Sequence, residues 1–318
     1  MTITPDRDVV SLEREFSDYA FEQMHPLVKV WRGDQLKTDI REATTRLVAL
    51  IVDDAAGKYA ETLKGLAQLP EQFKMRLIEI ERYRFLAQID FADPSASSPF
   101  VAIFGASTPP GTIADARIVR RLADKFAVFA PRRIRFCQSA HVPIEAAGTH
   151  VDQHFLAGLA REMAARPSAP GLARVILQRP TDLGFYRRYV ETYNLMYLER
   201  PQMRGEVRIE TEETLAACHA EGLLYEIEVD GTWAGIVAAR HQVVAGARGT
   251  YMVEILLNGA ARGQRLGPAV HQRLAAKVAA ADSSAILTGT IAAVNVPSLK
   301  TATRAGRVEI GAWHWISV

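Results

Sequence analysis

The chain has 318 residues, of which 48% are hydrophobic and 23% charged, and its formal net charge is +2. This composition is typical of a soluble globular protein, and so small a net charge excludes a global attraction to nucleic acid or membranes, so any anion site must be local. The length predicts two domains. The two cysteines, Cys137 and Cys218, cannot form a disulfide framework and are consistent with a reducing compartment. Because the N-terminus lacks the pattern of a signal peptide and no apolar run is long enough to span a membrane, we expect a cytoplasmic protein.

The N-terminal part, residues 1–166, is expected to be a helix-rich α/β domain of unknown role. Its predicted elements are a helix from about Gln35 to Leu63, a helix from Pro70 to about Arg82, a loop at 94–99, a strand at 100–104, a helix at 113–129 and a strand at 133–137. The strand-helix-strand order recurs in the C-terminal part. The domain is therefore either a degenerate copy of the C-terminal fold or an unrelated α/β domain, and no fixed-period repeat decides between them.

His150 and His154 would lie one helical turn apart, a spacing that could bind a metal. The glutamate of a zinc-protease motif is absent, since Val151 takes its place. We expect a solvated helix face here and no bound metal.

Residues 166–171 combine two prolines, a serine and a glycine, which predicts a linker before a second domain at 172–318. The predicted order in this domain is strand, two helices, three strands, helix, strand, helix, strand. The strands are expected at 172–178, 223–229, 232–240, 249–257, 285–291 and 308–316, and the helices at 181–198, 211–220, 266–280 and 297–305. Asp230-Gly231 between the second and third strands predicts a tight β-hairpin, because that turn needs two positive φ angles.

A strand from Tyr251 to Leu257 runs through a basic, glycine-containing turn into a helix. Backbone N–H groups at the start of a helix have no intrahelical partner, and with the helix dipole they favour a bound phosphate. Arg262 and Arg265 add positive charge beside Gly263 and Gly267. The turn is therefore either an anion site or a plain structural turn, and this combination of residues favours the anion site.

The C-terminal half resembles the GNAT superfamily of acyl-CoA-dependent N-acyltransferases. The family signature is Arg or Gln, two residues, Gly, one residue, then Gly or Ala, and Arg262-Gly-Gln-Arg-Leu-Gly267 is similar to it. The sequence departs from the signature at Arg265, where the family has glycine. The predicted hairpin before the motif and the segment from Asn295 to Gly306 after it also resemble the family. The resemblance implies an α/β fold with a mixed, mostly antiparallel central sheet and flanking helices.

The resemblance also implies an acyl-CoA co-substrate, with acetyl-CoA as the default donor, and no metal. Backbone N–H groups of the motif would cradle the pyrophosphate, and the Leu257 backbone would bind the pantetheine arm and stabilise the oxyanion. Asn295 and Ser298 would lie near the pantetheine and the thiol. The implied cofactor-binding residues are Leu257, Arg262, Gly263, Gln264, Arg265, Gly267, Asn295 and Ser298, with Leu257 and Ser298 also counted as catalytic.

A carboxylate within an apolar strand costs desolvation unless it is paired or functional, so Glu254 is either the general base that deprotonates the amine or an outward-facing residue. Tyr189 and Tyr193 belong to an aromatic stripe at helical spacing, which is typical of a core. The resemblance instead places this helix at the acceptor site, where Tyr189, Tyr193 and Asn194 would contact the substrate. Many family members have a general-acid Tyr where this chain has Ala302. Thr301, Thr303 or His314 could substitute, or the thiolate could leave without an acid.

The expected function is transfer of an acyl group from acyl-CoA to the amine of a small molecule, with no nucleic-acid or membrane partner; a homodimer is left open. The alternative is a catalytically inert acyl-CoA-binding or sensing protein, which the residues at positions 265 and 302 favour. A third reading is a protein that binds another nucleotide at the same turn.

Overall fold

The computed structural model describes residues 7–51, 73–91, 98–109, 111–144, 146–244 and 246–318. The chain forms two compact units. Unit 1 comprises Met1–Asp152, Ala245–Ala247 and Ile310–Val318, and unit 2 comprises Gln153–Val244 and Arg248–Glu309. The expected linker at 166–171 lies within unit 2, because the strand before it, β5 (Thr149–Leu159), pairs with β10 (Ile286–Ala292) of the same unit.

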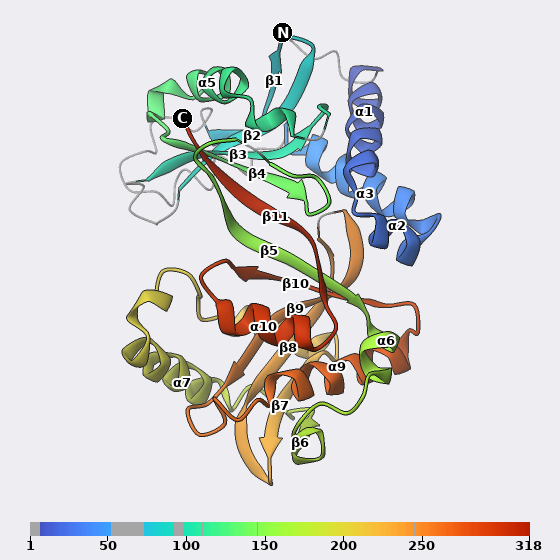
Figure 1. The fold of residues 1–318 in the computed structure, drawn as a ribbon, viewed down its shortest axis with the longest axis vertical. Helices are drawn as coiled ribbons and strands as arrows, with labels where there is room; N and C mark the ends of the chain where they lie inside the picture. Colours follow the sequence, from blue (N-terminus) through green and yellow to red (C-terminus); the bar gives the residue numbers. More distant parts are fainter. Residues whose placement is uncertain (1–6, 52–72, 92–97, 110, 145, 245) are drawn as a thin grey trace. The chain divides into compact units, whose positions relative to one another are not determined.

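Unit 1 is a sheet with helices on both faces (Figure 1). Its elements are α1 (Arg7–Gln23), α2 (Pro26–Arg32), α3 (Gln35–Ala49), β1 (Arg76–Ile80), β2 (Tyr83–Phe91), β3 (Pro99–Ala106), α5 (Ala116–Asp124), β4 (Arg133–Ser139) and β11 (Val308–Ser317). The strand order is β1-β2-β3-β4-β11, with β3 and β4 parallel and the other neighbours antiparallel. Leu12 and Phe16 of α1 pack with Leu86 on one face, while Ile118 and Leu122 of α5 pack on the other.

Two helix predictions in the N-terminal part are wrong. The described part of the predicted helix from Pro70 to Arg82 contains strand β1, in which Ile78 and Ile80 are buried and Glu79 is exposed, a period of two that fits a strand. His150 and His154 lie on β5 rather than on a helix. The predicted helix from Gln35 is present as α3 but ends at Ala49, and residues 52–63 of that prediction lie outside the described residues.

Unit 2 has the mixed, mostly antiparallel sheet that the sequence predicted. Its further elements are α6 (Ala160–Ala165), β6 (Val175–Gln178), α7 (Tyr186–Glu199), α8 (Glu212–Ala220), β7 (Leu224–Val229), β8 (Thr232–Val244), β9 (Ala247–Leu257), α9 (Gly267–Ala281) and α10 (Val296–Arg304). The order is β5-β10-β9-β8-β7-β6, and β9 and β10 are parallel. The turn at Asp230-Gly231 has φ angles of 51° and 77°, which confirms the predicted hairpin.

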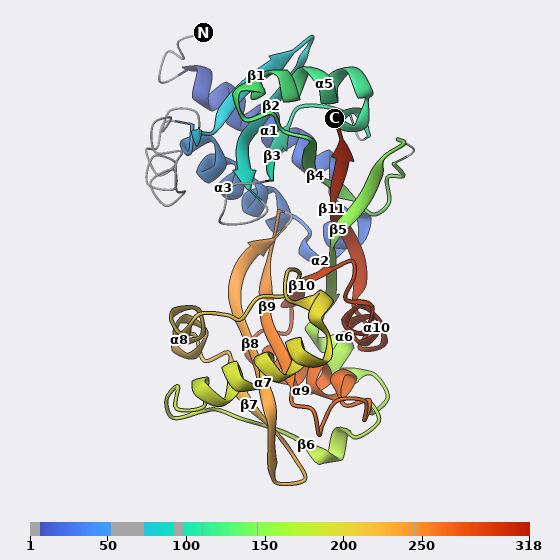
Figure 2. The ribbon, with the colours of Figure 1, turned by 90° about the vertical axis from the view of Figure 1, so that its left-hand side faces the viewer.

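The sheet of unit 2 separates two apolar cores (Figure 2). On one face, α7 and α8 pack against Leu224, Ile236 and Leu256. On the other, α6 and α9 pack against Val237 and Met252. Residues that alternate along β8 and β9 therefore point to different helices, and we refer to these faces as the α7 face and the α9 face.

Unit 1 repeats the topology of unit 2. In unit 1, β3 pairs in parallel with β4 at Val101↔Ile134 and Ala102↔Arg135, with α5 between them in the chain. In unit 2, β9 pairs in parallel with β10 at Leu287↔Thr250 and Thr288↔Tyr251, with α9 between them. An antiparallel strand then completes each sheet, β11 beside β4 and β5 beside β10. This correspondence favours the degenerate copy over an unrelated domain.

Candidate functional site

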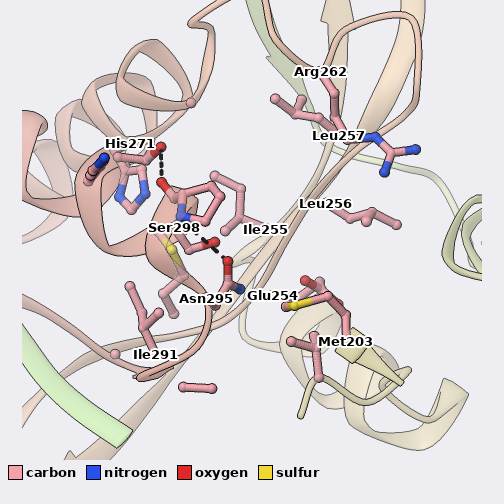
Figure 3. Close-up of a pocket in the computed structure, with 18 of the residues that line it drawn as sticks. Met203, Glu254, Ile255, Leu256, Leu257, Arg262, His271, Ile291, Asn295 and Ser298 are labelled. Atoms are coloured by element: carbon pink, nitrogen blue, oxygen red, sulfur yellow. Dashed lines mark hydrogen bonds between the residues drawn. The ribbon is translucent and has the colours of Figure 1, made fainter. Parts of the chain in front are cut away.

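A cavity of about 710 Å³ lies where β9 and β10 of unit 2 separate (Figure 3). The parallel pairing ends at Thr288↔Tyr251, although β9 continues to Leu257 and β10 to Ala292. The first turns of α9 and α10 complete the wall. The volume is within the range of small-molecule sites.

An irregularity in β8 holds the end of β9 at this cavity. The β7–β8 register shifts between Ile227 and Glu228, and Gly235 has a φ of 147°. A Cβ at Gly235 would lie 1.9 Å from the carbonyl oxygen of Leu256, so only glycine lets the two backbones approach this closely. The Asn258 N–H then donates to the Ala234 carbonyl at 2.7 Å.

The alternation of side chains along β9 is broken at the cavity. Met252 and Ile255 pack on the α9 face, whereas Val253 packs on the α7 face and Glu254 bonds to α7. Two consecutive side chains on one face are typical of a β-bulge. Here the irregularity directs Glu254 to the α7 face instead of the α9 face, which regular alternation after Val253 would give it. In Figure 3, Glu254 lies beside Met203 on one side of the strand, with Ile255 and His271 on the other.

Glu254 is a buried carboxylate held by two tyrosines of α7. Its side chain is 7% exposed, and the hydroxyls of Tyr189 and Tyr193 each donate to Oε2 at 2.7 Å. Burial raises the pKa of Glu254 to about 7, although the two hydrogen bonds oppose this shift. Burial and the charge of Glu254 raise the pKa values of both tyrosines, so their hydroxyls remain donors. Near neutral pH the carboxyl can therefore both accept and release a proton.

The turn after β9 has the backbone geometry of an anion cradle. Gly263 has a φ of 80° and Arg265 a φ of 61°, and Leu266 follows with a right-handed φ of −78°. Successive left-handed and right-handed residues point neighbouring N–H groups into one concavity, and the N-terminus of α9 follows directly at Gly267. Arg265 therefore adopts the backbone conformation that glycine would allow, and its Cβ does not abolish the cradle. Donors in this arrangement can bind an anionic group.

The arginine side chains of the motif differ in their contacts. Arg262 lines the cavity, but its Nη1 lies 3.2 Å from Oε2 of Glu199, and the side chain is only 18% exposed. Arg265 is exposed and lines both this cavity and a second one of about 510 Å³, which Arg166 and Arg304 also line. Gln264 is not among the residues lining either cavity, because its side chain bonds to Arg174 at 2.9 Å and to the Ala260 carbonyl at 2.7 Å.

The first turn of α10 forms the opposite wall. Asn295 caps the helix, its Oδ1 accepting from the Ser298 N–H at 3.4 Å, and both residues line the cavity together with Leu257 and Gly267. A Cβ at Gly267 would lie 2.5 Å from Cγ2 of Thr301, so this glycine allows α9 and α10 to approach closely.

The position of the usual general acid holds Ala302, which is fully buried. The three suggested substitutes have other contacts. The hydroxyls of Thr301 and Thr303 donate to the carbonyls of Pro297 and Leu299 at 2.9 and 3.0 Å. His314 belongs to unit 1, where its ring stacks on Phe136.

Of the three predicted substrate residues, Tyr193 lines the cavity, Tyr189 is fully buried against Glu254, and Asn194 is exposed on α7 and does not line the cavity. The sequence reasoning missed His271 and Arg307, two buried polar residues that line the cavity. His271 looked like an ordinary helix residue, and nothing in the local pattern distinguished Arg307 from a solvated arginine before a strand.

Two other features concern metals and membranes. Within the described ranges there is no group of three or more His, Cys, Asp or Glu side chains that could hold a metal ion. In the same part of the chain, no helix combines the length and apolar character that crossing a membrane requires.

Comparison with known proteins gives matches among solved structures. No family model matches the sequence, and no curated protein matches it. An acetyltransferase of the GNAT family from Colwellia psychrerythraea is 9% identical with a TM-score of 0.51, and the alignment covers 82% of this chain and 93% of that one. A GCN5-related glucosamine N-acetyltransferase region of a fungal multi-domain beta-N-acetylglucosaminidase is 12% identical with a TM-score of 0.53, covering 99% of this chain and 37% of that one. The fold of this chain is similar to the fold of these two N-acetyltransferases.

Proposed function

We propose that the protein transfers an acyl group from acyl-CoA to the amine of a small molecule, with acetyl-CoA as the default donor. The observation that carries this proposal is Glu254, a buried carboxyl with a pKa of about 7 in the same cavity as an anion cradle. A buried carboxyl with a shifted pKa that lines a cavity is typical of a functional site, and the left-handed residues Gly263 and Arg265 directly before a helix N-terminus favour a bound anion.

The donor is expected to lie along β9. The N–H groups from Gly263 to Gly267 would hold the pyrophosphate, with the Arg265 side chain beside it. Arg166, Arg265 and Arg304 around the second cavity provide positive charge for the remaining phosphate of the nucleotide. The Leu257 backbone, Asn295 and Ser298 would contact the pantetheine arm.

The donor supplies an activated acyl thioester, and the chain supplies a base and a hydrogen-bond donor. An ammonium has no lone pair, so Glu254, directly or through water, takes a proton from the amine before attack. The Leu257 N–H would stabilise the negative charge that develops on the thioester oxygen. Because a thiol has a pKa of about 8.5, the thiolate can leave without a dedicated acid, which agrees with Ala302 at the usual acid position.

The acceptor is expected to enter from the α7 face. Glu206 and Glu210 line the cavity there together with Tyr193 and Met203. Carboxylates at the entrance attract a cationic amine, and the apolar residues around them exclude water. The expected cytoplasmic location and the small-molecule class of the acceptor stay predictions.

Ala302 also favours a second candidate function, a protein that binds acyl-CoA without turnover. Two measurements separate the candidates. Both predict that CoA raises the melting temperature and that ATP, which lacks the pantetheine arm, raises it less. Only the enzyme predicts that free thiol appears when acetyl-CoA is mixed with a panel of small amines. Stabilisation by CoA without thiol release from any amine would contradict the enzyme, and equal stabilisation by ATP would contradict both candidates.

A further inference from the structure

Arg307 is a fully buried cation in the wall of the cavity. Its side chain is 1% exposed, and it lines the cavity next to Met252 and Gly289, directly beyond the last paired residues of β9 and β10. Nη2 donates to the Leu156 carbonyl at 2.7 Å, and Nη1 lies 4.0 Å from Sδ of Met252. Nε has no hydrogen-bond partner among the described residues.

Among the residues that the structure describes, no carboxylate compensates this charge. Within the described part of the chain Arg307 forms no salt bridge, and the titratable groups that act on it are Tyr251 and His271. Burial lowers the pKa of Arg307 to about 10, so the guanidinium is still charged at neutral pH. Burial and Arg307 lower the pKa of His271 to about 3, so its imidazole is neutral. A buried charge without a partner is strongly unfavourable, which suggests that an anion completes the site.

The surrounding backbone is shaped around the guanidinium. A Cβ at Gly289 would lie 2.6 Å from Nη2 of Arg307, so glycine at position 289 leaves room for the guanidinium in its observed position. His271 lies in the same cavity wall, is 2% exposed, and its Nδ1 also has no partner among the described residues. Two buried nitrogens, Nε of Arg307 and Nδ1 of His271, therefore have no hydrogen-bond partner among the described residues that line this cavity.

From its position, Arg307 would contact the acyl group of the donor rather than the amine. This step rests on the proposed function, in which the pyrophosphate lies beyond Leu257 and the reacting carbonyl lies near Glu254. Met252, which Arg307 contacts, precedes Glu254 by two residues, about 7 Å along a strand, on the side away from the pyrophosphate. Met252 packs on the α9 face, whereas Glu254 bonds to α7. An acyl chain that extends past the thioester would therefore reach Arg307, and an amine on the α7 face would not.

We propose that the preferred acyl donor carries a terminal carboxylate, a short dicarboxylic acyl thioester such as succinyl-CoA, and that Arg307 binds this carboxylate. The neutral imidazole of His271 can donate a second hydrogen bond from Nδ1. The reaction keeps the balance of the proposed function: Glu254 takes one proton from the ammonium group, the freed amine nitrogen forms a bond to the acyl carbon, and the carbon–sulfur bond breaks. The second proton that the nitrogen loses as the amide forms protonates the departing thiolate, so CoA is released as the free thiol. The carboxylate of the acyl group is not consumed.

The test compares the affinities of the full-length protein for succinyl-CoA and butyryl-CoA by isothermal titration calorimetry. The two esters have acyl chains of equal carbon number, and only the first has a carboxylate. Because hydrogen bonds between charged groups are strong, we expect succinyl-CoA to bind at least about ten-fold more tightly. Equal affinities would overturn the assignment of Arg307 and leave the proposed function intact. If neither ester nor CoA binds, the proposed function itself fails.

Two variants then test whether Arg307 causes the preference for succinyl-CoA. Arg307→Met keeps the length of the side chain without its charge, and we expect it to remove the preference for succinyl-CoA while acetyl-CoA binds as in the wild type. Arg161→Met, at an exposed position of α6, is the matched control and should keep the preference. A preference that survives in Arg307→Met would overturn the assignment. If Arg307→Met does not fold, the affinities of the wild-type protein for the two esters still show whether the site prefers an acyl group with a carboxylate.

Discussion

The hydroxyl of Tyr193 lies 2.7 Å from Oε2 of Glu254, and this bond joins α7 to β9 across 61 residues of sequence. Tyr189 donates to the same oxygen at the same distance. The two tyrosines fix the orientation of the carboxyl and lower its pKa, while burial raises it. The protonation state of Glu254 is thus set by a balance between its burial and α7.

Tyr193→Phe removes one of the two bonds and little else, since Phe keeps the ring. We expect the pKa of Glu254 to rise by about one unit, because a hydrogen bond to a charged group contributes on the order of 1.5 kcal/mol. The measurement is the pH dependence of kcat/KM, whose acid limb should move to higher pH. Tyr189→Phe should shift the limb in the same direction but also destabilise the fold, because the Tyr189 hydroxyl accepts the Glu210 N–H at 2.9 Å. An unchanged limb in both variants would contradict the proposed role of Glu254.

Glu254 should also make stability depend on pH. Its folded pKa of about 7 lies above its ordinary value of 4.5, so the protonated carboxyl is favoured in the folded state. This contribution is fully present below pH 4.5 and is lost as the pH rises through 7, with a total on the order of 3 kcal/mol. The free energy of unfolding of Glu254→Gln, which cannot titrate, should therefore rise relative to the wild type between pH 4.5 and pH 8. A difference between the two proteins that stays constant over this range would show that Glu254 keeps an ordinary pKa.

Arg265 combines charge with a left-handed backbone, and two substitutions separate these properties. Arg265→Gly and Arg265→Ala both remove the guanidinium, so both should weaken CoA binding to a similar extent. Only glycine relieves the strain at a φ of 61°, so Arg265→Gly should be about 1 kcal/mol more stable than Arg265→Ala in denaturant unfolding. Equal stabilities would mean that the residue does not keep this backbone conformation.

Gly267→Ala tests the close approach of α9 and α10. The new Cβ would meet Cγ2 of Thr301 at 2.5 Å, and we expect a loss of about 1–3 kcal/mol together with weaker CoA binding. Thr301→Ser removes the clashing methyl group, so the double variant should recover much of the loss. Additive effects of the two substitutions would contradict the contact, because independent sites add within about 0.5 kcal/mol.

Local signals predicted much of unit 2 and less of unit 1. Asp230-Gly231 specifies its turn by itself, and the turn after Leu257 has left-handed residues of the kind that an anion cradle needs, because both features depend on backbone conformation within a few residues. The sequence predicts a helix before Arg82, where the structure has strand β1. A short run of apolar residues fits either a helix or a strand, and only the burial of Ile78 and Ile80 in the sheet shows that it is a strand.

Long-range relationships were not accessible from the sequence. The strand β5 was missed, and it closes a sheet through pairing with residues more than a hundred positions away. The bonds from Tyr189 and Tyr193 to Glu254 likewise depend on the packing of α7 over β9, and the sequence could only place the tyrosines on one helix face. Arg307 is buried by contacts with α9, β5 and β10 together. The residues next to Arg307 in the sequence give no sign of these contacts.

The most direct test of the central claim is the pH profile of acyl transfer by the wild type and by Glu254→Gln, followed as thiol release from a saturating acyl-CoA with an accepted amine. We predict a wild-type profile that rises with pH through about 7 and a variant whose turnover is at least about a hundred-fold lower, without that rise and with unchanged CoA affinity. Turnover in Glu254→Gln equal to that of the wild type, with the same acid limb, would contradict the account.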